Sequence, residues 1–162
     1  MTTCYFNLKD LYNKHGPHEF GRICQALLEI SLREISFKTR GRAVERPDIS
    51  AERGTERYAI EAKVPFYSEI SITNRDLDGL KEFSSLGVTP ILATLLIEPT
   101  TKWVFAKANL IKQGKYSKIE LINYDVNSVS LAINKIFPQI VERVFDLAMG
   151  RGSEGLREQL DN

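Results

Sequence analysis

Apolar residues follow a helical spacing near both ends of the chain. In the first segment, Phe20, Ile23 and Leu27 begin an apolar stripe that predicts a helix over about residues 17–34, with Pro17 suited to its first turn. A second stripe predicts a helix over residues 125–149 that Pro138 kinks or splits and Gly150 stops. Residues 151–162 are then expected to form a flexible tail.

Between these helices the apolar pattern changes to that of strands. Two short strands, residues 43–50 and 57–64, are predicted to form a hairpin whose turn contains Gly54. Alternation along the second strand places Glu61 and Lys63 on one face and its larger apolar residues on the other. A carboxylate and an ammonium group are therefore expected side by side on this strand.

The rest of the pattern completes an α/β arrangement. The further predicted elements are a helix over about residues 75–85, a buried strand over 89–97, a strand over 102–106 and an edge strand over 119–124. This order predicts a sheet flanked by helices within a single domain, residues 1–150.

Composition narrows the function only a little. The 162 residues carry a net charge of +1, so nucleic-acid binding requires a local basic patch rather than a basic surface overall. The two cysteines lack metal-type spacing, which favours free thiols in a reducing compartment. The sequence has no apolar N-terminal signal and no run of about 20 apolar residues. A cytoplasmic location without membrane contact is therefore expected.

The hairpin carries the most informative chemistry. Asp48 lies on the first strand and can be brought beside Glu61 and Lys63 on the second. Two carboxylates suit a hard divalent cation such as Mg²⁺, which activates a bound water. A neighbouring ammonium offsets the charge that builds on a phosphate during hydrolysis. An ordinary solvated strand face is the alternative interpretation of Glu61 and Lys63.

The hairpin resembles the PD-(D/E)xK nuclease superfamily, with Pro47-Asp48 followed by Glu61-Ala62-Lys63. The order of elements over about residues 17–108 is most similar to archaeal Holliday-junction resolvases and related restriction-endonuclease-like proteins. This resemblance implies a mixed central sheet flanked by helices, here with an added C-terminal helix. It also implies a metal-dependent DNA endonuclease that uses Mg²⁺ or Mn²⁺ on branched or structured DNA.

The resemblance also implies roles for individual residues. Asp48 and Glu61 would bind the metal, with the Ala62 carbonyl as a third ligand. Lys63 would be the catalytic ammonium group, and Glu19 an outer acid, a position for which Glu29 competes. A homodimer is expected, because a two-fold dimer can cut both strands of a junction symmetrically.

A basic segment precedes Asp48 and is expected to bind DNA phosphates. Its cations are Lys38, Arg40, Arg42 and Arg46. Two other functions remain open. One is a restriction- or repair-type nuclease on duplex or single-stranded DNA, and the other is a non-catalytic DNA-binding or assembly subunit of the same fold.

Overall fold

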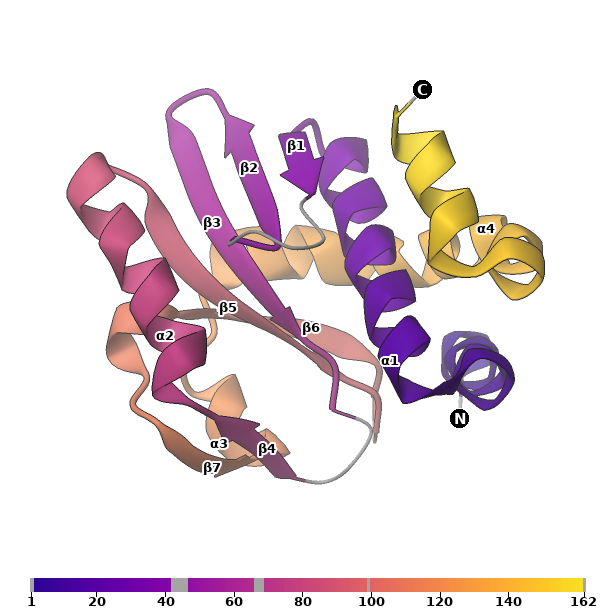
Figure 1. Cartoon of the computed structure of the whole chain (residues 1–162), viewed down its shortest axis with the longest axis horizontal. Coiled ribbons are helices and arrows are strands. Elements are labelled where there is room, and N and C mark those ends of the chain that lie inside the picture. Colours follow the sequence, from indigo (N-terminus) through magenta and orange to yellow (C-terminus); the bar gives the residue numbers. More distant parts are fainter. Residues whose placement is uncertain (1, 42–46, 66–68, 99, 162) are drawn as a thin grey trace.

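A five-stranded sheet forms the centre of the computed structural model, which describes residues 2–41, 47–65, 69–98 and 100–161 (Figure 1). Its strand order is β1-β2-β3-β5-β6. Strands β3 and β5 are parallel, whereas all other neighbours in this sheet are antiparallel, so the sheet is mixed. The strands are β1 (Lys38–Gly41), β2 (Ile49–Arg53), β3 (Glu56–Lys63), β5 (Thr89–Leu96) and β6 (Lys102–Lys107).

Helices cover both faces of this sheet. On one face, α1 (Thr3–Glu34) and α4 (Asn127–Asp161) enclose the larger apolar core, which includes Ile60 of β3. On the other face, α2 (Asn74–Lys81) covers a smaller core that includes Ala59 of β3. The predicted alternation along β3 is thus confirmed, and so is the predicted sheet flanked by helices.

Smaller elements extend the second face. A two-stranded sheet pairs β4 (Glu69–Ile72) with β7 (Gly114–Ser117). The other elements are the 3-10 helices η1 (Glu82–Leu86) and η2 (Ala108–Leu110) and the short helix α3 (Lys118–Ile122). Within the described residues, no helix combines the length and the apolar character needed to cross a membrane.

The first helix is longer than the sequence pattern predicts. It begins at Thr3, where the Thr2 side chain accepts a hydrogen bond from the Tyr5 amide. At Gly16 the backbone leaves helical geometry with a φ of 81°, and the helix resumes at Pro17. The predicted start at Pro17 is therefore the start of the second half of α1, and the turn before it needs the freedom of glycine.

Two strand predictions need correction. The basic segment after α1 contains a strand, β1, rather than only a connection. The predicted edge strand at 119–124 is instead helical over its first part, because Ser117 and Glu120 form a capping box that starts α3. Strand β2 begins at Ile49, and Pro47 and Asp48 precede it outside the strand. Residues 42–46, where the first hairpin strand was predicted to begin, lie outside the described residues.

The predicted flexible tail is the last part of α4. The backbone of α4 departs from helical geometry at Gly152, with a φ of 62°, and not at Pro138. The helix then continues to Asp161 and buries Leu156 and Leu160 against the larger core. Figure 1 shows this yellow segment beside α1. Gly152 turns the chain but does not end the helix, so apolar contacts with α1 continue after Gly152.

Candidate functional site

Asp48 lies immediately before β2, where its carboxylate reaches β3. The Ala62 amide donates a hydrogen bond of 2.9 Å to Asp48 Oδ2. In the antiparallel register Ile49 pairs with Ile60, so the position before Ile49 faces Glu61. The Asp48 carbonyl also accepts a hydrogen bond from Gln25 of α1, at 3.3 Å. The hairpin and α1 together therefore place the Asp48 carboxylate beside Glu61.

Glu61 and Lys63 share the face of β3 that is covered by α2. Alternation puts both on the side of Ala59, which belongs to the smaller core. Glu61 is only 9% exposed, whereas Lys63 is half-buried. A nearly buried carboxylate and a more accessible ammonium group thus lie on the same face of the sheet, near the C-terminal end of its middle strand.

The Lys63 ammonium group is held by Asp76 at the start of α2. Lys63 Nζ lies 2.9 Å from Asp76 Oδ2, and the Thr73 amide and hydroxyl bind the same oxygen, each at 2.9 Å. Burial favours a raised pKa for Asp76, but the hydrogen bonds from Thr73 and Lys63 and the charge of Lys63 together lower it. Asp76 therefore stays ionised and orients Lys63.

Asp76 was not among the residues singled out from the sequence. The available signal was Thr73, which caps α2 and is followed three residues later by an acid. That spacing predicts the capping box that the structure contains. It does not predict the ion pair with Lys63, because the relative position of α2 and β3 depends on the tertiary fold.

The donor set suits a hard divalent cation. Asp48, Glu61 and the Ala62 carbonyl offer oxygen atoms at adjacent positions of the hairpin. The described residues contain no group of three or more His, Cys, Asp or Glu side chains suited to a metal ion. Mg²⁺ nevertheless needs only one or two carboxylates, because it keeps several waters. These residues therefore fit the ion.

The two glutamates of α1 that the resemblance singles out, Glu19 and Glu29, contact α4 rather than the hairpin. Glu19 accepts hydrogen bonds from the Ser153 hydroxyl at 2.8 Å and the Ser153 amide at 3.1 Å. Glu29 is fully buried and pairs with Arg157 at 2.6 Å. Within the described residues, neither Glu19 nor Glu29 forms a hydrogen bond or an ion pair with Asp48 or Glu61. Glu19 thus caps the start of the helical segment that resumes after Gly152. This contact differs from the role of outer catalytic acid that was expected for Glu19.

Glu19→Ala is expected to destabilise the fold by about 1 kcal/mol, the usual cost of losing a helix cap. Urea denaturation of the wild type and the variant measures this difference. Glu19→Gln provides the control, because its amide oxygen can still accept the bond from Ser153. A large loss of catalytic activity in Glu19→Ala, with unchanged stability, would instead indicate that Glu19 acts in the candidate site.

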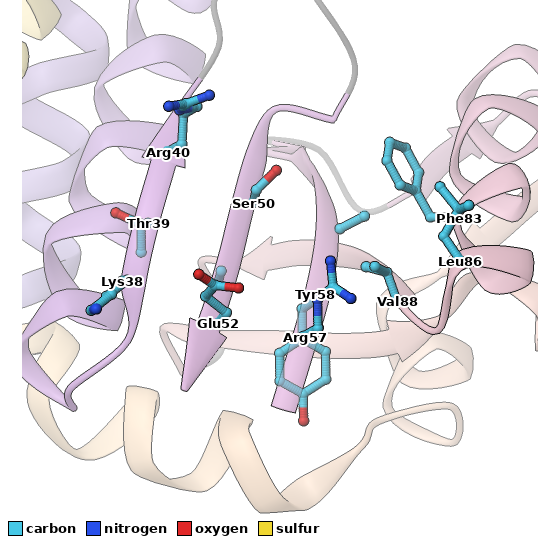
Figure 2. A pocket seen from close by; sticks show the side chains of 12 residues that line it. Lys38, Thr39, Arg40, Ser50, Glu52, Arg57, Tyr58, Phe83, Leu86 and Val88 are labelled. Atoms are coloured by element: carbon cyan, nitrogen blue, oxygen red, sulfur yellow. The ribbon is translucent and has the colours of Figure 1, made fainter. Parts of the chain in front are cut away.

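The basic segment contributes two described cations to the sheet. Lys38 and Arg40 are exposed on β1. In the backbone register of the sheet they lie opposite Glu52 and Ser50 of β2, respectively. Arg42 and Arg46 lie outside the described residues. Figure 2 shows Lys38 and Arg40 at one side of a pocket of about 440 Å³ on this part of the sheet.

Comparison with known proteins relates the fold to a nuclease. No protein-family model matches the sequence, and no curated protein matches it. The structure is similar to that of Hjc, a Holliday junction resolvase from the archaeal hyperthermophile Archaeoglobus fulgidus, with a TM-score of 0.53 and 20% identity. The match covers 64% of this chain and 88% of Hjc. The chain therefore has the restriction-endonuclease-like fold: a mixed sheet flanked by helices.

Proposed function

We propose that this protein is a metal-dependent endonuclease of the PD-(D/E)xK type that hydrolyses phosphodiester bonds in branched DNA. The observation that carries the proposal is the hydrogen bond from the Ala62 amide to Asp48, which holds one carboxylate beside Glu61. Lys63 lies two positions further along the same strand face. The fold shared with Hjc, a Holliday junction resolvase, supports branched DNA as the substrate.

In this mechanism Asp48, Glu61 and the Ala62 carbonyl would hold Mg²⁺ or Mn²⁺. Such an ion would supply polarisation of the scissile phosphate and a lowered pKa for a bound water. Asp76 orients the Lys63 ammonium group, which stabilises the negative charge that develops on the phosphate oxygens. Glu61 is nearly buried, so its carboxylate is held in a fixed position for the ion.

The proposed assembly is a homodimer. A four-way junction has strands related by two-fold symmetry, and two copies of the chain related by the same symmetry present one site to each strand. One chain contributes one set of Asp48, Glu61 and Lys63. Two symmetric cuts therefore require two chains or two successive binding events.

The wild-type protein is expected to cut a labelled four-way junction at least about tenfold faster than a duplex or a single strand of the same sequence. Such a difference corresponds to about 1.4 kcal/mol of preferential interaction with the branched substrate. Gel analysis of the products with Mg²⁺ or Mn²⁺ measures the rates, and EDTA should stop the reaction. Equal cutting of all three substrates would favour a restriction- or repair-type nuclease.

One observation favours a second candidate, a non-catalytic DNA-binding or assembly subunit. The Lys63 ammonium group is already engaged by Asp76 at 2.9 Å, as in a purely structural ion pair. In such a subunit the same fold would bind DNA without hydrolysis. Junction binding with no cutting in either metal would support this candidate over the nuclease.

A further inference from the structure

A pocket of about 440 Å³ lies on the face of the sheet formed by β1, β2 and β3. Its polar side chains come from three neighbouring strands, and its apolar side comes from η1 and the residues after it (Figure 2). The volume is within the range of pockets that bind small molecules or single nucleotides.

The polar side of the pocket carries three cations and one carboxylate. Lys38 and Arg57 are cross-strand neighbours of Glu52, from β1 and β3 respectively. Arg40 is the third cation. Within the described residues, none of these four side chains forms a hydrogen bond or an ion pair. The cations are therefore available to an anionic ligand, and the pocket has an excess of positive charge.

The other side of the pocket is apolar. Phe83 is half-buried, Leu86 is 65% exposed, and Val88 completes this wall. Figure 2 shows Phe83 and Leu86 across the pocket from Lys38 and Arg40. An aromatic ring beside an exposed leucine provides a surface on which a nucleobase can stack.

The pocket and the candidate site share one face of the sheet. Arg57, Ala59, Glu61 and Lys63 alternate along β3 and therefore point to the same side. Arg57 lies four residues before Glu61, which corresponds to about 13 Å along an extended strand. A DNA strand bound at Glu61 can thus reach the pocket within a few nucleotides.

We propose that this pocket binds one unpaired nucleotide of the DNA strand held at the candidate site. The base stacks on Phe83 and Leu86, and its polar edge donates hydrogen bonds to Glu52. Arg57 and Arg40 contact the flanking phosphates. The Glu52 carboxylate repels a phosphate at the centre of the pocket, which favours a base there over a continuous backbone. The identity of the ligand as DNA rests on the proposed function.

The test compares the binding of two labelled DNAs by fluorescence anisotropy in EDTA, which prevents cutting. One is a duplex with a two-nucleotide bulge, and the other is the same duplex fully paired. The wild type should bind the bulged duplex at least about tenfold more tightly, as expected when one base stacks on an aromatic side chain. Phe83→Leu should remove most of this preference, since leucine keeps the packing against the smaller core but lacks the ring.

A pair of leucines with equal exposure supplies the control. Leu86 in the pocket and Leu131 on α4 are each 65% exposed, so neither truncation should disturb the fold. Leu86→Ala should weaken binding of the bulged duplex several-fold, whereas Leu131→Ala should leave it unchanged. Equal affinity of the wild type for both DNAs would overturn the pocket assignment while leaving the nuclease proposal intact. Failure to bind either DNA would also overturn the pocket assignment, whereas the nuclease proposal is tested separately by cutting of the four-way junction.

Discussion

Lys63→Ala is expected to slow cleavage of a four-way junction by about 100- to 1000-fold, the usual effect of losing one group that stabilises charge in the transition state. The binding of the junction should change much less, because one cation among several contributes little to the total phosphate contact. Asp76 keeps its hydrogen bonds with Thr73 in the variant, so the start of α2 should remain folded. Single-turnover rates and equilibrium binding, measured separately, distinguish these effects.

Lys81→Ala is a suitable control for Lys63→Ala. Lys81 is an exposed lysine at the end of α2. Its substitution removes the same charge as Lys63→Ala but leaves the candidate site unchanged. Its cleavage rate should remain near that of the wild type. Metal-dependent cutting that persists in Lys63→Ala at the wild-type rate would contradict the proposed mechanism.

Arg157→Ala is expected to lower the free energy of unfolding by about 3 kcal/mol. The substitution leaves the fully buried Glu29 carboxylate without its cation, and an uncompensated buried charge is costly. The estimate is at the lower end of the usual range because the Arg157 side chain is 31% exposed. Urea denaturation followed by circular dichroism measures the change.

The same helix offers a matched control for this prediction. Arg151 also pairs with a glutamate, Glu158, but both side chains are about half exposed. Arg151→Ala should therefore lower the free energy of unfolding much less than Arg157→Ala does, because an exposed ion pair contributes little to stability. In Glu29→Gln the buried charge is removed, so adding Arg157→Ala to it should cost less than Arg157→Ala alone. If Arg151→Ala and Arg157→Ala lowered the free energy of unfolding equally, burial of the Glu29 carboxylate would not be the cause of the loss in Arg157→Ala.

The sequence was informative wherever the physical cause is local. Alternation along β3 placed Glu61 and Lys63 on one face because successive side chains of any strand point in opposite directions. The helix predicted over about residues 75–85 corresponds to α2 and η1, which end before Gly87, a glycine in the left-handed conformation with a φ of 75°. Register within the hairpin then brought Asp48 opposite Glu61.

Only the tertiary structure decided which partners the charged side chains take. Glu19 and Ser153 are 134 positions apart, and Glu29 and Arg157 are 128 positions apart. No local pattern encodes such contacts, since they depend on how α4 turns at Gly152 and packs against α1. The pairing of Lys63 with Asp76 likewise depends on where α2 crosses the sheet. The sequence by itself determined the chemistry carried by the hairpin, whereas long-range packing decided which acids belong to it.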